Sequence, residues 1–89
     1  MPLFNLGQVV ATPAALQHFQ KHQINPISLL GRNIGGDWGD LSEADVAANV
    51  HAIQHDLRLF SSYAVGGGKV WVITEADRSS TCLLLPSEY

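Results

Sequence analysis

The feature that most constrains the fold is the stretch from Val70 to Leu85, which reads VWVITEADRSSTCLLL. Its two ends are β-branched, aromatic or apolar, as strands prefer, and its centre is a charged turn. Residues 59–65 before it have the period of two that is typical of a strand, and three glycines separate the two segments. We therefore predict a three-stranded antiparallel meander over residues 59–65, 70–74 and 81–85.

Helices are predicted before the meander, because three segments start with a side chain that caps helix N-termini. Thr12–Pro13 and Asn25–Pro26 combine an N-cap residue with proline in the first turn. Ser42 opens a third helix and has Asp45 at the reciprocal position of a capping box. The apolar residues expected to face the core are Leu16 and Phe19, then Ile27, Leu30 and Ile34, then Val46, Val50, Ile53 and Leu57.

Helices followed by strands predict an α+β fold, with the N-terminal helices packed on the meander in one domain spanning residues 1–89. The short apolar segment 6–11 is a candidate fourth strand beside the last one. A small sheet needs one covered face, and the helices supply the cover. Cys82 lies among leucines in the last predicted strand, so we expect an inert core thiol.

Composition excludes several classes of function. The net charge is −3, with five scattered basic residues, which argues against direct nucleic-acid binding. Only 15% of residues are charged, so apolar surface should remain for a protein partner or a homodimer. A single cysteine suits a reducing cytoplasm. The start MPLFNLGQVV resembles no secretory leader, and no apolar run approaches the roughly 20 residues that span a bilayer.

The loop GGDWGD, residues 35–40, is the first candidate site. Trp38 between glycines is either an anchor in the domain's core, which we favour, or a hot spot for a partner. Asp37 and Asp40 flank it and can bond loop backbone or contribute to a binding surface. The glycines lack the lysine and the spacing of a phosphate-binding loop, so we expect no nucleotide cofactor.

The turn that carries Glu75, Asp77 and Arg78 is the second candidate site. Charges at a hairpin tip usually form a local ion pair of small energetic value. They can also present a recognition surface. Trp71 and Ile73 share a strand face with Glu75, so that face changes from apolar to charged toward the turn. A binding edge there is a second interpretation.

The histidines form two pairs with a spacing of four residues, His18 with His22 and His51 with His55. This spacing places both rings of a pair on one helix face, as in helices that bind zinc. The second pair lies opposite the predicted buried stripe, so we favour solvated histidines and predict no native metal. The alternative is a metal-dependent hydrolase that combines Asp37 and Asp40 with histidines.

Three segments, LGQVVATPAAL, GDWGDLSEAD and WVITEADRSSTCLLLPSEY, resemble a family of small proteins from bacterial plasmids and integrated mobile elements. The resemblance spans nearly the whole chain. It implies an accessory role in the biology of mobile DNA. We therefore expect a small non-enzymatic binding protein that acts through protein–protein contacts. Inhibition of a host defence enzyme is a minor alternative of the same kind.

Overall fold

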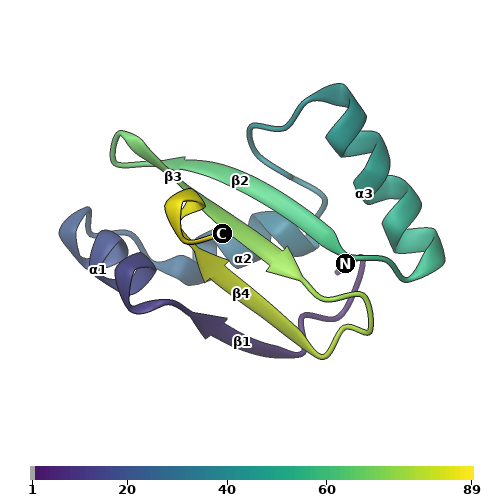
Figure 1. Cartoon of the computed structure of the whole chain (residues 1–89), viewed down its shortest axis with the longest axis horizontal. Coiled ribbons are helices and arrows are strands. Elements are labelled where there is room, and N and C mark those ends of the chain that lie inside the picture. Colours follow the sequence, from purple (N-terminus) through teal and green to yellow (C-terminus); the bar gives the residue numbers. More distant parts are fainter. Residues whose placement is uncertain (1) are drawn as a thin grey trace.

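The computed structural model of the protein describes residues 2–89 (Figure 1). The chain forms three helices, four strands and a final 3-10 turn. In chain order these are β1 (Gln8–Ala11), α1 (Pro13–Lys21), α2 (Pro26–Ile34), α3 (Glu43–His55), β2 (Leu59–Val65), β3 (Gly68–Thr74), β4 (Ser80–Leu84) and η1 (Pro86–Glu88). The predicted α+β class is confirmed.

The four strands form one sheet in the order β1-β4-β3-β2. β2, β3 and β4 are the predicted antiparallel meander. The candidate fourth strand is present as β1, but it pairs with β4 in parallel, so the sheet is mixed. All three helices lie between β1 and the meander in sequence, and such a long connection can return a strand in the parallel sense.

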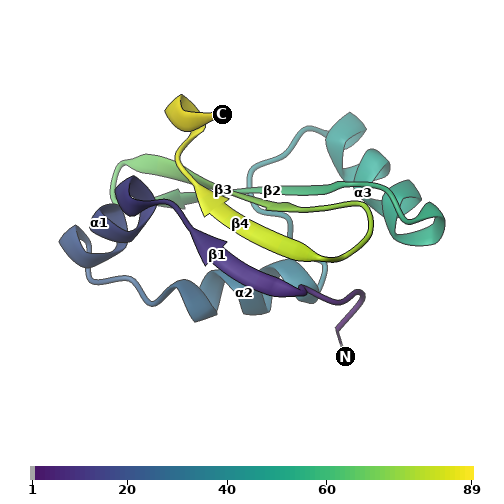
Figure 2. The same ribbon diagram turned by 60° about the horizontal axis from the view of Figure 1, so that its bottom comes forward.

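The two faces of the sheet have different neighbours (Figure 2). α1 and α2 lie against one face, whereas η1 stands over the other, and α3 lies beside β2. The main core fills the space under α1 and α2, as expected for helices that cover a small sheet. Its buried members are Ala15, Phe19, Leu29, Tyr63, Val65, Val70, Val72 and Leu83.

Each helix begins where the capping residues predict. The side chain of Thr12 accepts a hydrogen bond from the backbone N–H of Ala15, and Asn25 and Ser42 do the same for α2 and α3. Such caps satisfy backbone N–H groups that have no partner inside the helix. None of the helices within residues 2–89 combines the length and apolar character that crossing a membrane requires.

The predicted buried faces of the helices are only partly correct. Four residues expected in the core are exposed, namely Leu16, Ile27, Val50 and Leu57. Smaller or polar side chains take the inward positions beside the remaining apolar ones: Ala15 on α1, Asn33 on α2, and Asn49 and Ala52 on α3. Small side chains allow the helices to approach the sheet closely, and Asn49 uses its polarity in a specific contact with β2.

That contact closes part of the outer edge of β2. The side-chain amide of Asn49 donates to the carbonyl of Phe60 at 2.6 Å, and its oxygen accepts from the Phe60 N–H at 3.1 Å. Two residues further along the strand, the backbone of the loop after α2 bonds to the same edge. Ser62 donates its N–H to the carbonyl of Trp38 at 3.1 Å, and its carbonyl accepts from the N–H of Asp40 at 2.7 Å. The edge of β2 is therefore bonded as though another strand lay beside it.

Candidate functional site

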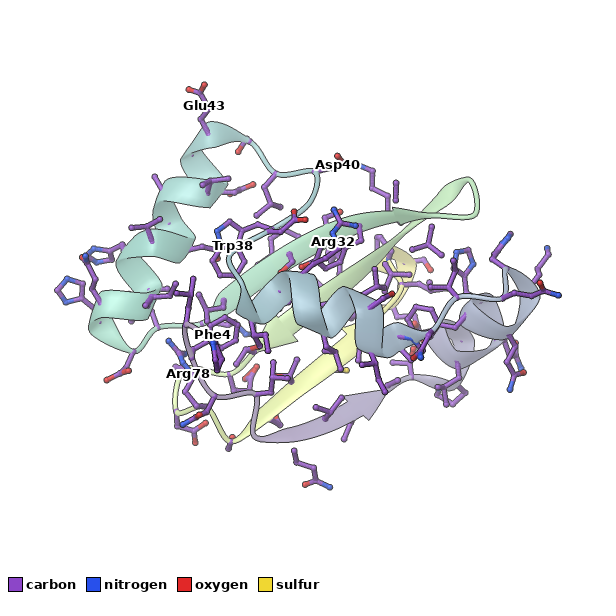
Figure 3. All side chains as sticks on the ribbon, turned by 180° about the vertical axis from the view of Figure 1, so that it is seen from behind. Phe4, Arg32, Trp38, Asp40, Glu43 and Arg78 are labelled. Carbon is purple, nitrogen blue, oxygen red and sulfur yellow. The ribbon has the colours of Figure 1, made fainter. Side chains whose placement is uncertain are left out.

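The loop of residues 35–40 is built around a buried tryptophan. Trp38 is only 6% exposed and packs with Ala52 of α3 and Leu59 of β2. The ring of Phe4 stacks on it at a centroid distance of 6.1 Å. Figure 3 shows Trp38 turned inward between α3 and the sheet. The favoured interpretation of Trp38 as a core anchor is confirmed, and its ring is not displayed to a partner.

Gly39 allows this loop to approach β2. Its φ is +73°, in the left-handed region, and a Cβ atom there would collide with the carbonyl of Ser62. The two hydrogen bonds between the loop and Ser62 need this close approach. The glycine is thus required for the edge contact.

The two aspartates of the loop are engaged in local contacts. Asp37 forms an ion pair with Arg32 at 2.7 Å and accepts the N–H of Gly39 at 3.1 Å. The Arg32 guanidinium, followed by that N–H, lowers the pKa of the Asp37 carboxyl below its ordinary range. Asp40 lies 3.8 Å from the ammonium of Lys69 and points outward (Figure 3). Asp37 therefore helps to fix the loop, whereas Asp40 has only this exposed contact.

The alternative of a metal-dependent hydrolase requires a cluster of ligands. Within residues 2–89, no three side chains of histidine, cysteine, aspartate or glutamate are grouped closely enough to hold a metal ion. The rings of His18 and His22 have centroids 4.5 Å apart, and those of His51 and His55 are 4.2 Å apart. His18 Nε2 lies 2.8 Å from the carbonyl of Val65. The pairs are close, but the aspartates of the loop do not join them.

The turn between β3 and β4 is also largely structural. Arg78 donates hydrogen bonds to four carbonyls, those of Ala52, Leu57, Glu75 and Ala76. It thereby bonds the C-terminal end of α3 to the turn. Asp77 accepts the N–H of Ser79 at 2.9 Å and fixes the turn backbone. The third predicted residue, Glu75, instead forms an ion pair with Arg58, which immediately precedes β2.

Glu75 belongs to a surface that we call the open face, the side of the sheet opposite α1 and α2. The strand register places Phe60, Ile73, Cys82 and Val10 in one row across all four strands. Trp71 and Leu84 form the next row. Apolar side chains therefore gather on this face, although the covering helices lie on the other side.

Cys82 is part of this row. It is half-buried, so the expectation of a core thiol is wrong in its placement. Partial burial raises the pKa of the thiol above its ordinary value, which keeps the thiolate fraction small at neutral pH. Its contribution to the open face is therefore that of a small apolar side chain.

A pocket of about 240 Å³ opens on this face. It is lined by Arg58, Phe60, Trp71, Ile73 and Tyr89. The rings of Phe60 and Trp71 meet edge to face at 4.9 Å, and Tyr89 meets Trp71 at 5.6 Å. Aromatic pairs of this geometry hold one another in place, so the three rings form a defined wall. We call this feature the aromatic pocket.

Arg58 is the charged member of the aromatic pocket. Its Nε and Nη2 donate to the Glu75 carboxylate at 3.1 and 3.4 Å, and its Nη1 donates to the Tyr89 hydroxyl at 3.1 Å. These contacts, chiefly the carboxylate, raise the pKa of the guanidinium. A guanidinium carries five N–H groups, so two remain without a partner among residues 2–89. Arg58 lines an apolar cavity, so an acceptor on a ligand bound there could use them.

Sequence reasoning found this site only in part. The shared face of Trp71, Ile73 and Glu75 follows from strand alternation and is confirmed. Arg58 and Tyr89 were missed because they lie just outside the predicted strands and reach the pocket only through the register of β2 and through η1. Comparisons of the chain with protein-family models, curated proteins and solved structures find no match.

Proposed function

We propose that this protein is a non-enzymatic binding module that contacts a protein partner through its open face. The aromatic pocket is the observation that carries the proposal. It combines three aromatic walls with one arginine, a composition that is enriched where protein surfaces bind one another strongly. The partner would place one apolar side chain in this pocket, against the rings that line it.

The chemistry of Arg58 favours an acidic group next to that side chain. Its pairing with Glu75 is exposed to solvent, with both side chains about half accessible. Such surface pairs contribute little net energy, so a ligand carboxylate can share the guanidinium at small cost. The preferred ligand is therefore a segment in which an aromatic or large aliphatic residue neighbours an aspartate or glutamate.

The alternative of a metal-dependent hydrolase has less support. Asp37 is held by Arg32 and Gly39, and Asp40 lies near Lys69, so neither carboxylate is presented together with histidines. An inhibitor of a host defence enzyme would be one kind of protein-binding module. The resemblance to plasmid-associated proteins makes an accessory role in mobile-element biology part of this proposal.

Blocked dipeptides test the pocket directly. We would titrate acetyl-Asp-Phe-amide, acetyl-Asn-Phe-amide and acetyl-Lys-Phe-amide into ¹⁵N-labelled protein and follow the indole N–H signals of Trp71 and Trp38 by NMR. The signal of Trp71 should shift because this residue lines the pocket. The signal of Trp38, which is buried against Ala52 and Leu59 away from the pocket, serves as an internal control. We expect the aspartate peptide to bind most tightly and the lysine peptide least.

Two variants of equal charge sharpen this test. Arg58→Gln should remove the preference for the aspartate peptide, while Lys21→Gln, at the exposed end of α1, should leave it unchanged. If none of the peptides shifts the Trp71 signal, the pocket is not a binding site. Equal binding of all three peptides to the unaltered protein would refute the role given to Arg58.

A further inference from the structure

The aromatic pocket has room for one side chain and not for a larger ligand. Its volume of about 240 Å³ lies below the roughly 300–1,000 Å³ of most small-molecule sites. Phe60, Trp71 and Ile73 belong to strands of the sheet. Tyr89, by contrast, follows η1, which Figure 2 shows raised above the sheet, and is 72% exposed. The pocket therefore takes one apolar side chain, and the rest of its ligand remains outside.

The polar groups at this pocket are hydrogen-bond donors. Glu75 accepts from Nε and Nη2 of Arg58, and the Tyr89 oxygen accepts from Nη1. One N–H on each of the two Nη atoms therefore remains without an acceptor among residues 2–89. The hydroxyl proton of Tyr89 likewise has no acceptor within this part of the chain. A ligand in the pocket meets two N–H groups and one O–H group, so its own polar group must be an acceptor.

A carboxylate matches these donors better than other polar groups do. It only accepts hydrogen bonds, and it can accept two N–H groups of one guanidinium at once. An amide would bring N–H groups of its own, and the one side-chain acceptor in the lining, the Tyr89 oxygen, is already bonded to Arg58. Arg58 is the single cation of the lining and is paired with Glu75, so one negative charge suits it better than the nearly two of a phosphate monoester.

The place of Arg58 in the lining limits how far the carboxylate lies from the apolar side chain. Because Arg58 itself lines the pocket, both groups of the ligand bind within one small cavity. In an extended peptide, neighbouring side chains point to opposite faces, so an acidic residue next in sequence would point away from the guanidinium. The α-carboxylate at the end of a chain, in contrast, shares a Cα atom with the last side chain. A C-terminal residue therefore supplies both groups in the space available.

We propose that the aromatic pocket binds the C-terminal residue of a partner protein. The aromatic or large aliphatic side chain of that residue enters the pocket, and its free α-carboxylate accepts hydrogen bonds from Arg58. This inference rests on the proposed binding function and specifies the acidic group that Arg58 recognises. The preceding residues of the partner would lie over the open face, where Ile73 of the pocket continues into Cys82 and Val10. A small carboxylic acid would leave that surface unused, which favours a protein chain.

Two probes that differ only in the carboxylate test this assignment. We would titrate acetyl-phenylalanine and acetyl-phenylalanine amide into ¹⁵N-labelled protein and follow the indole N–H signal of Trp71. The free acid should bind about five to ten times more tightly than the amide, with a dissociation constant of about 0.1–10 mM. Arg58→Gln should remove this preference, whereas Lys21→Gln should keep it. Equal binding of the two probes to the unaltered protein overturns the proposal, and so does a preference that survives Arg58→Gln. The ¹H–¹⁵N spectrum of each variant verifies that its fold is retained.

Two further probes separate a protein C-terminus from a small acid, and this inference from the proposed function. Acetyl-Val-Val-Phe with a free carboxylate should bind at least about threefold more tightly than acetyl-phenylalanine, because its valines reach the open face. A longer probe that binds no more tightly would assign the pocket to a small carboxylic acid and overturn the partner's C-terminus. If acetyl-Asp-Phe-amide binds but free acetyl-phenylalanine is not preferred over its amide, this inference alone is refuted. If no probe shifts the Trp71 signal, the proposed function fails as well.

Discussion

On one edge of the sheet, the outward backbone groups of β2 are bonded to Asn49 and to the loop that carries Trp38. On the other edge, the outward groups of β1 face solvent. Both strands read as ordinary strands, and neither carries a charge. The difference arises from what the chain places beside them. The edge of β2 is closed by the side-chain amide of Asn49 and by the backbone of the loop that the buried Trp38 anchors. The stability of this closed edge should therefore depend on Asn49 and Trp38.

The largest effect is expected from removing the tryptophan. Trp38→Ala should lower the free energy of unfolding by about 3–5 kcal/mol, because it leaves a cavity beside Ala52 and Leu59 and loosens the loop that bonds to Ser62. Urea denaturation followed by circular dichroism measures the loss. Trp71→Ala is the matched control, since that ring lies on the open face and is partly exposed. An equal or larger loss for the control would contradict the anchoring role of Trp38.

Asn49 should have the next largest effect. Asn49→Ala leaves the N–H and C=O of Phe60 without the partners they have now, which costs about 1–3 kcal/mol for a buried polar group. Hydrogen exchange should also accelerate at the amide of Phe60, which the substitution deprives of its acceptor. Gln54→Ala on the exposed side of the same helix should change stability by less than about 0.5 kcal/mol. If the two variants lose the same stability, Asn49 does not close the edge.

Asn49 also shows where sequence reasoning stops. The N-caps at Thr12, Asn25 and Ser42 are local signals, so the starts of the helices could be predicted, as could the strands of the meander. The inward faces of the helices could not. Periodicity favours Val50 over Asn49, but the structure buries the asparagine because its amide satisfies a strand edge that no local pattern reveals.

The aromatic pocket was out of reach for a similar reason. Strand alternation places Trp71, Ile73 and Glu75 on one face, and that part of the site could be predicted. The arrival of Arg58 and Tyr89 depends on how β2 is registered against β3 and on the turn into η1. Both are tertiary features. In the predicted loop site, Trp38 is buried and the loop backbone bonds to the edge of β2, a role that no local pattern in the sequence indicates.

The smallest effect concerns the carboxylate beside this loop. The pKa of Asp37 is lowered, first by Arg32 and then by the N–H of Gly39, so the charged form is the one that stabilises the fold. Such a group contributes its stability above its unfolded pKa and loses it as the pH falls through its folded pKa, below about pH 5. The side chain is 55% exposed, so solvent screens the contribution to well under about 1 kcal/mol.

The gap in unfolding free energy between the unaltered chain and Asp37→Asn isolates this contribution from the titration of other carboxylates. It should be largest near pH 7, should narrow as the pH falls below the pKa of an unfolded aspartate, and should close only where the folded Asp37 is itself protonated and resembles the amide. Added salt at pH 7 should narrow it as well, because the ion pair with Arg32 is at the surface. A gap that is constant from pH 7 to pH 3 would mean that the loop is held by Trp38 and Gly39 alone. The closure of the β2 edge would then be independent of charge, and the open edge strand β1 carries no charge either.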